Sequence, residues 1–348
     1  MKILNCVSLL LLWSSAGLAK INPNPFVIVD NCKDTPGTEV TLKNPPRAET
    51  TGVLPTCFGP SSAFLVQSYI CKVKGISNCS SISDDDQVSI FSTISWANKN
   101  TSLINGQERP SEMPSSYTNI TFAAGSGTRA LVNSARAFSF KPEACYPVNK
   151  INNKFGSEKE FLDRMAQMNE LYLHNRNSTE ACESCLIESI RANLDVTIDD
   201  AGLRSALQKT TFEEFLYKII FKDCSKNVAV SPPPVVEIYP KIGETVAKKA
   251  VIAKIGETIT SDRPLLLEGI CVLRKNENEC EAAGKHSIAI KGYKECCRPG
   301  KDCRKLVQVQ NSWGEDWQKK FNNGWVDAET LVNNIEEPIK PGVMSWYK

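Results

Sequence analysis

Long apolar runs are missing from this 348-residue sequence. A membrane-spanning helix needs about 20 consecutive apolar residues. The apolar stretch at residues 3–13 is shorter, and no later stretch approaches that length. One-sided charge is missing too, because 41 Lys and Arg residues stand against 39 Asp and Glu residues, and no basic block occurs. These absences predict a chain with no membrane span and no nucleic-acid partner.

The N-terminus has the pattern of an export signal. Lys2 supplies a positive charge, residues 3–13 are mostly apolar, and small residues precede a cleavage point after Ala19. Cys6 lies inside this segment, too far from the cleavage point to be a lipid-anchored cysteine. We therefore expect a signal peptide at residues 1–19 and a mature chain at residues 20–348 that is periplasmic or secreted.

Cysteine is plentiful, and its count is informative. The chain has 14 cysteines, and loss of Cys6 with the signal leaves 13. Cysteines of an exported protein usually pair. An odd count therefore means that one thiol stays free, pairs between chains or does chemistry. Short spacing predicts two small disulfide loops: Cys71 with Cys79, and Cys271 with Cys280.

The sequence does not fix the pairing of the other cysteines. Cys182-Glu-Ser-Cys185 has the spacing of a redox motif or of half a zinc site. No thioredoxin-like unit and no second pair of ligands accompany it. We therefore expect disulfides that involve Cys224, and neither a metal site nor a cofactor. Three more cysteines crowd one later turn: Cys296, Cys297 and Cys303.

The apolar pattern divides the chain into three regions. Residues 20–149 contain short apolar runs and turns, with helical patterns at residues 57–71 and 128–138. Residues 150–226 are helical, with capping boxes that start at Ser157 and at Thr210. Three consecutive prolines then form a stiff linker to a last region of short strands. We expect strands at residues 264–267, 287–290, 306–309 and 325–326.

The most informative stretch contains one of only two histidines in the chain. It begins His286-Ser-Ile-Ala-Ile-Lys-Gly-Tyr and is followed by Asn311-Ser-Trp-Gly-Glu-Asp-Trp. This pairing resembles the papain-like cysteine proteases, in which a strand His-Ala-Val-x-x-x-Gly-Tyr precedes an Asn-Ser-Trp-Gly-x-x-Trp element. The resemblance implies that His286 and Asn311 are catalytic and that Trp313 shields the bond between them. The other histidine, His174, is interpreted as a surface residue of the helical region.

The same family carries its catalytic cysteine near the mature N-terminus, in a Gln-Gly-x-x-x-x-Cys-aromatic sequence that opens a long helix. Here Thr51-Gly-Val-Leu-Pro-Thr-Cys-Phe occupies that place, and its Thr-Cys-Phe is similar to the Thr-Cys-Tyr of bacterial members. The resemblance makes Cys57 the nucleophile, in agreement with the odd cysteine count. Thr51 replaces the glutamine that serves the oxyanion hole, which makes its hydroxyl, or that of Thr50, the candidate donor. A shifted register would make Ser61 the nucleophile but leaves Thr-Cys-Phe unmatched.

Two other stretches extend the resemblance. In the family, a pair of glycines like Gly125 and Gly127 lies in the substrate cleft, and Pro264-Leu-Leu-Leu-Glu-Gly is similar to the strand that precedes the histidine. The implied fold is α+β, with a helical left lobe headed by the Cys57 helix and a β-rich right lobe that carries the histidine and the asparagine. Residues 150–226 lie outside the resemblance and are interpreted as a helical insertion beside or over the cleft.

The implied chemistry is hydrolysis of a peptide or protein substrate through an acyl-enzyme. A helix N-terminus and a nearby imidazolium can lower a cysteine pKa from ~8.5 to ~3–4, so we expect an ion pair between Cys57 and His286. Loss of one oxyanion donor typically costs ~10²–10³ in rate. This keeps open an inactive relative that binds peptides or a partner protein. Only 37 residues, 20–56, separate the signal from Cys57, so we expect no N-terminal inhibitory segment.

Overall fold

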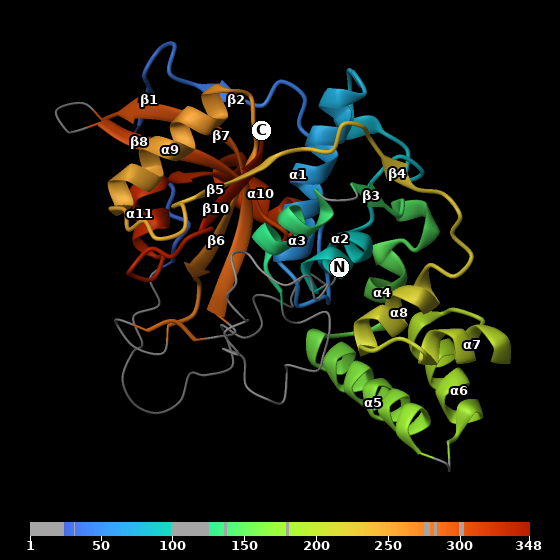
Figure 1. Ribbon diagram of the computed structural model, residues 1–348. Helices are drawn as coiled ribbons and strands as arrows, with labels where there is room; N and C mark the ends of the chain where they lie inside the picture. The colour runs from blue at the N-terminus through green and yellow to red at the C-terminus, as the bar shows by residue number, and fades with distance from the viewer. Residues whose placement is uncertain are drawn as a thin grey trace, which may run out of the picture.

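The protein is described by a computed structural model that covers residues 24–30, 32–98, 125–135, 138–178, 181–274, 279–281, 284–298 and 303–348. The expected signal peptide and Cys6 lie outside these residues. Within them, the chain has an α+β fold, with a sheet on one side of the molecule and most of the helices on the other (Figure 1). The two-lobe α+β arrangement expected from the sequence is confirmed.

An antiparallel sheet forms the β-rich lobe. Its strands follow the order β5 (Val236–Tyr239), β10 (Met344–Tyr347), β6 (Leu265–Cys271), β7 (Lys285–Cys297), β8 (Cys303–Gln310) and β9 (Trp325–Asp327). Two short strands, β1 (Lys33–Asp34) and β2 (Val40–Thr41), pair with the second half of β7. The four strands expected from the sequence are present as β6, β7, β8 and β9.

Side chains along β6 alternate between two apolar layers. Leu265 and Leu267 share a core with Ile255 of α9 (Lys248–Thr260). Leu266, between them, shares a core with Leu65 of α1 (Phe58–Val73). Successive side chains of a strand point to opposite faces, so the sheet is packed between α1 and α9. The first half of β7 is buried on both faces for the same reason.

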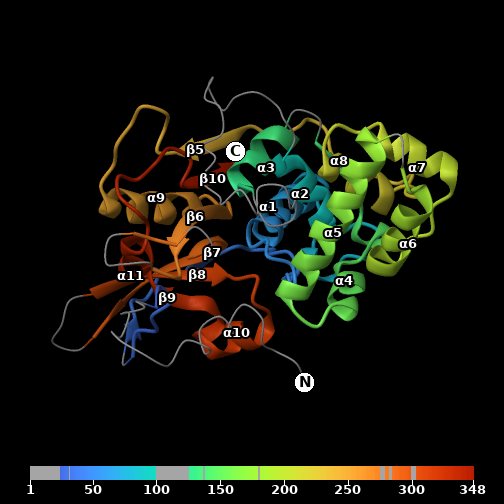
Figure 2. The same cartoon turned by 90° about the horizontal axis from the view of Figure 1, so that it is seen from below.

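The helical lobe is arranged around α1, which lies between the sheet and the other helices (Figure 2). One apolar core joins α1 to α2 and to the helices that follow, and it includes Phe58, Ile94, Phe161 and Phe215. The region expected to be helical therefore shares a core with the Cys57 helix. Its helices and those beside it are α2 (Ile90–Asn98), α3 (Gly127–Ser134), α4 (Val148–Lys154), α5 (Glu158–Asn177), α6 (Glu183–Leu194), α7 (Asp200–Leu207) and α8 (Phe212–Ile220).

The helix expected at residues 128–138 is shorter than predicted, because α3 ends at Ser134. Phe138 lies in the apolar core beside the sheet. The next residues form β3 (Ser139–Phe140), which pairs with β4 (Val228–Ala229). This pairing brings the chain back from the helices, and residues 230–235, with the three prolines, lead on to β5.

Side-chain caps begin both of the helices with predicted capping boxes. The Ser157 hydroxyl accepts from the N–H of Glu160 at 3.1 Å and caps α5, as predicted. The box predicted to start at Thr210 is wrong by one residue. Thr211 caps α8 by accepting from the N–H of Glu214, and the Glu214 carboxylate accepts from the Thr210 hydroxyl. Two threonines and two glutamates are adjacent here, so the spacing fits either register.

Six cysteine pairs lie at disulfide distance. Cys57 is the free cysteine of the described part of the chain, as the odd count requires. Two of the pairs are the predicted loops: Cys71 with Cys79, and Cys271 with Cys280.

Cys224 forms a disulfide, as expected, but its partner does not come from the Cys-x-x-Cys pair. Cys182 pairs with Cys185 at the start of α6. Cys224 pairs instead with Cys145, which lies 79 positions earlier in the sequence. Spacing along the chain does not reveal such a pair, because only the folded backbone brings its members together.

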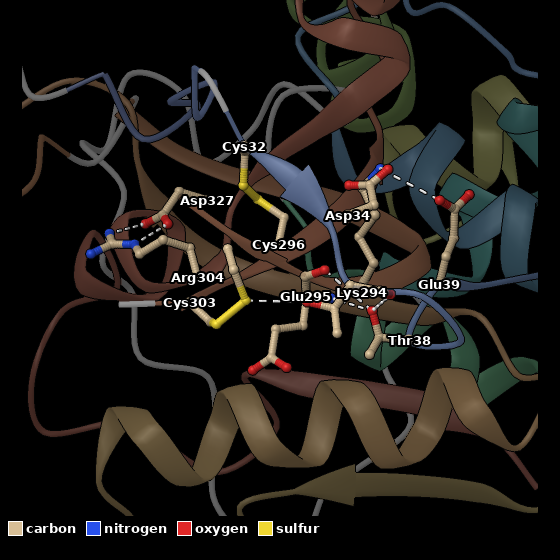
Figure 3. The surroundings of a disulfide bond; sticks show 12 residues. Cys32, Asp34, Thr38, Glu39, Lys294, Glu295, Cys296, Cys303, Arg304 and Asp327 are labelled. Atoms are coloured by element: carbon tan, nitrogen blue, oxygen red, sulfur yellow. Dashed lines mark hydrogen bonds and ion pairs between the residues drawn. A yellow bond between two sulfur atoms is a disulfide. The ribbon is translucent and has the colours of Figure 1, made fainter. Parts of the chain in front are cut away.

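A disulfide fastens the N-terminal segment to the sheet (Figure 3). It joins Cys32, before β1, to Cys296 of β7. Nearby, the ammonium of buried Lys294 lies 2.8 Å from Asp34 and 3.4 Å from Glu39. These contacts hold the residues before the Cys57 loop along β7. The remaining pair is Cys297 with Cys303.

Candidate active site

Cys57 stands immediately before α1, as its N-cap residue. Pro60 lies in the first turn, where backbone N–H groups have no intrahelical partner, so the helix can begin there. The thiol is partly buried, and the backbone N–H of Ser287 donates to its Sγ at 3.3 Å. Ser287 follows His286 in β7. The packing of α1 on β7 thus brings Cys57 to the residue that follows His286, 230 positions later in the sequence.

Ser61, the alternative nucleophile, lies one turn inside α1 and is buried. Its hydroxyl lies 2.8 Å from the carbonyl oxygen of Cys57 and 3.1 Å from that of Ser287. A hydroxyl that donates to backbone carbonyls within a helix is poorly placed to attack a substrate. The geometry therefore favours Cys57 over Ser61.

His286 of β7 is held by a hydrogen bond to the residue that follows β8. Because β8 runs antiparallel to β7, the end of β8 lies beside the start of β7. Asn311 is the first residue after β8, and its Oδ1 lies 2.9 Å from His286 Nε2. An amide oxygen only accepts, so Nε2 carries the proton, and Nδ1 of the neutral ring is free to accept one. This is the tautomer that a base acting on a thiol requires.

Aromatic rings enclose this hydrogen bond. Trp313, the residue predicted to shield this bond, stacks on the imidazole, with centroids 4.7 Å apart and planes at 29°. Phe26 meets the same ring edge-on at 6.2 Å and packs edge-on against Trp313. Sequence reasoning missed Phe26, because it lies in an N-terminal segment with no recognisable motif. His286 is only 5% exposed as a result.

Burial suppresses charge on both candidate catalytic groups. Desolvation raises the pKa of the Cys57 thiol to about 11, although hydrogen bonds from Ser287 act in the opposite direction. Desolvation also lowers the pKa of His286 to about 4, against the bond to Asn311, which raises it. Near pH 7 the site therefore holds a neutral thiol and a neutral imidazole. This differs from the ion pair expected from the sequence.

Thr51, the candidate oxyanion donor, is buried and bonded to the turn that follows β8. Its amide and its hydroxyl both donate to the carbonyl oxygen of Ser312, at 3.2 and 3.4 Å. The hydroxyl of Thr50 donates to the same oxygen at 3.2 Å. These bonds join the loop before Cys57 to the turn after Asn311. To serve a substrate oxyanion, the Thr51 hydroxyl would have to leave Ser312.

A side chain of the helical region reaches the loop before Cys57. Asn152 of α4 accepts from the backbone N–H of Val53 at 3.0 Å. It also covers Gly52, where an added Cβ would overlap the Asn152 amide. Gly52 has a φ of +57°, a conformation that favours glycine. The sequence predicted that the helical region lies beside or over the cleft, but it did not indicate this contact.

Gly125 and Gly127 lie at the start of α3, against α1 and β6. A Cβ at Gly125 would overlap the ring of Phe58, the residue after Cys57. A Cβ at Gly127 would lie 2.6 Å from atoms of Leu266 and Ser62. The absent side chains therefore allow α3 to approach the helix that carries Cys57. This packing places both glycines near the candidate nucleophile.

Other candidate features lie away from this site. His174 is exposed on α5, as predicted. In the described ranges, no three or more His, Cys, Asp and Glu side chains are grouped so that they could hold a metal ion. Across the same part of the chain, no helix combines the length and apolar character needed to cross a membrane.

Comparisons with known proteins give weak likenesses. No family model matches the chain, and no curated protein matches it. Among solved structures, the proform of the ragweed pollen allergen Amb a 11, a cysteine protease, is 13% identical with a TM-score of 0.40, covering 92% of this chain and 67% of that one. The recombinant stem bromelain precursor is 10% identical with a TM-score of 0.41, covering 94% of this chain and 76% of that one.

A third solved structure, SERA5E from Plasmodium falciparum, is 12% identical with a TM-score of 0.39, covering 86% of this chain and 88% of that one. Likeness at this level carries no argument about activity. Any functional conclusion has to come from the chain's own residues. These are Cys57, with its free thiol before α1, and His286, whose ring is bonded to Asn311 and which precedes the residue that donates to that thiol.

Proposed function

We propose that the chain is an exported cysteine peptidase of the papain-like type, with Cys57, His286 and Asn311 as its catalytic residues. One observation carries the proposal: the free thiol at the start of α1 accepts from the residue next to a histidine whose Nε2 is fixed by Asn311. The sequence elements around all three residues, which resemble that family, support the same assignment. The sequence Thr56-Cys57-Phe58 is similar to the Thr-Cys-Tyr sequence of bacterial members of that family.

The reaction would begin with a neutral pair. As Cys57 Sγ bonds to the carbonyl carbon of a peptide, its proton passes to Nδ1 of His286. The imidazolium then protonates the leaving amine, and the C–N bond breaks to leave a thioester. Water, deprotonated by the same imidazole, hydrolyses the thioester and restores the thiol. Asn311 holds the ring in position throughout, and Trp313 keeps water from the bond between them.

The other parts of the chain have proposed roles that follow from this chemistry. Residues 1–19 would be a signal peptide, and residues 20–348 a peptidase domain whose helical insertion spans about residues 150–226. Thr51 remains the candidate oxyanion donor beside the backbone N–H of Cys57, while Gly125 and Gly127 would border the substrate cleft. The contact of Asn152 with the loop before Cys57 supports a place for the insertion beside the cleft.

A peptide-hydrolysis assay on three proteins tests the proposal. Cys57→Ala should abolish hydrolysis and keep the fold, because the thiol leaves without a large cavity. Ser61→Ala is the matched control and should retain activity. Loss of hydrolysis in the Ser61 variant, with activity kept in the Cys57 variant, would show that the nucleophile has been assigned to the wrong residue.

A second candidate function is peptide or partner binding without cleavage. The bonds that commit Thr51 to Ser312 and the high pKa of the Cys57 thiol favour this alternative. It predicts that wild type and Cys57→Ala bind the same peptides with equal affinity and that neither hydrolyses them. Turnover by the wild type alone would exclude it.

A further inference from the structure

Glu268 joins three elements beside the candidate nucleophile. It lies on β6, and its carboxylate accepts from the backbone N–H groups of Gly127 and Thr128 at the start of α3, both at 2.8 Å. The Ser126 hydroxyl donates to the same carboxylate at 3.0 Å, and the Ser287 hydroxyl of β7 donates to it at 3.3 Å. The carboxylate thus joins α3 of the helical lobe to β6 and β7 of the sheet.

These four donors use the acceptor capacity of the carboxylate. A carboxylate has about four lone-pair sites, and here each oxygen accepts two bonds. The N-terminus of α3 adds a favourable dipole. Glu268 is therefore a fixed negative charge with no free site for a substrate cation. Its effect on the reaction has to be exerted through its position and its charge.

Ser287 connects this charge to the thiol. Its hydroxyl donates to Glu268, while its backbone N–H donates to Cys57 Sγ at 3.3 Å. The negative charge of Glu268 opposes ionisation of Cys57 and adds to the effect of burial on the thiol pKa. From β7, the titratable neighbour is His286, which is neutral near pH 7.

The other elements around α1 add little charge near its first turn. The helix α2 and the strand β10 have no charged residue, and the charged residue of α1, Lys72, lies in its last turn. The charged residue of α3 is Arg129, which is not among the groups that shift the thiol. Among the charged groups of these elements, Glu268 is the one that raises the pKa of the Cys57 thiol.

We propose that Glu268 is a positioning residue that clamps α3 to the sheet and, through its fixed charge, keeps Cys57 protonated until a substrate is attacked. The inference rests on the proposed function, because control of thiol ionisation matters for the reaction only if Cys57 is the nucleophile. It assigns Glu268 no contact with substrate. Neutralising this one carboxylate should make the resting thiol more reactive while loosening the contact between α3 and the sheet.

The test is the pH dependence of Cys57 alkylation by iodoacetamide, followed by peptide mapping, in wild type, Glu268→Gln and Glu257→Gln. Glu257 is the matched control, an exposed glutamate of α9 paired with Lys254. Removal of a neighbouring like charge should lower the midpoint in Glu268→Gln by about one pH unit, so that alkylation below the midpoint becomes about tenfold faster. Glu257→Gln should match the wild type.

A folded Glu268→Gln protein with the wild-type alkylation profile overturns the inference. If that variant does not fold, Glu268→Ala takes its place with the same two outcomes, and a wild-type midpoint below the ordinary ~8.5 of a cysteine also overturns the inference. Alkylation needs no turnover. A chain that cleaves no peptide but shows the Glu268 effect refutes the proposed function alone, and a chain that cleaves peptides without the effect refutes this inference alone.

Discussion

Glu143 makes the stability of the protein depend on pH in an unusual direction. The residue lies in the short helical turn Glu143–Cys145 and is 4% exposed. Its Oε1 accepts from the backbone N–H of Val148, while its Oε2 has no partner among the described residues. Burial, aided by the charge of Glu49, raises the pKa of this carboxyl from 4.5 to about 8. Glu143 is therefore protonated in the folded protein at pH 7.

The sign and size of the effect follow from these two values. Between pH 4.5 and 8 the unfolded chain has lost this proton and the folded chain keeps it, so rising pH favours unfolding. The stabilisation is complete below pH 4.5 and is lost as the pH rises through about 8. At ~1.4 kcal/mol for each pH unit in this window, the free energy of unfolding falls by about 5 kcal/mol at most.

Urea unfolding of wild type and Glu143→Gln at several pH values between 5 and 8 checks this prediction. Glutamine keeps an acceptor for Val148 but cannot ionise, so the free energy of unfolding of the variant should fall less steeply with pH. Glu170→Gln, at an exposed position of α5, should follow the wild-type slope. Parallel curves for wild type and Glu143→Gln would refute the reasoning.

Three further predictions concern the candidate active site. Asn311→Ala should lower peptide hydrolysis ~10²-fold with the fold intact, because the imidazole loses its tautomer and orientation; an unchanged kcat/KM would contradict the role of Asn311. Thr51→Gln should raise the rate by up to ~10² if the oxyanion hole lacks a donor, and unchanged turnover in a folded variant would mean that another group serves it. Recombinant protein that begins at Lys20 should react with a thiol-directed epoxide without proteolysis. Reaction only after a cut within residues 150–226 would mean that the helical region restrains the enzyme.

The strands and the three candidate catalytic residues could be predicted because their signals are local. Each of the strands β6 to β9 overlaps an apolar run of the sequence. His286 and Asn311 are the first residues of the two motifs that resemble the papain-like family. The start of α1 at Cys57 follows from a tolerated early proline and an apolar run. In such stretches, local pattern and tertiary packing agree.

Features that depend on distant contacts could not be predicted in this way. Phe26 contacts His286 and Trp313, and Glu268 bonds to Ser287, in each case between separate segments of the chain. No sequence pattern near Phe26 or Glu268 indicates these contacts. The neutral state of the thiol and the imidazole has the same origin, because desolvation depends on how α1, β7 and the aromatic rings enclose them. Adjacent duplicated residues caused the smaller error at the α8 cap.

The central claim is that His286 makes Cys57 a nucleophile. The most direct measurement is the rate at which a thiol-directed epoxide labels Cys57, followed by peptide mapping, in wild type and in His286→Ala. We expect one label per chain, on the peptide that contains Cys57, and labelling slowed ~10²-fold in the variant, because the imidazole takes the thiol proton and returns it to the opened ring. Equal rates in the two proteins, or no label on Cys57 of the folded wild type, would contradict the account.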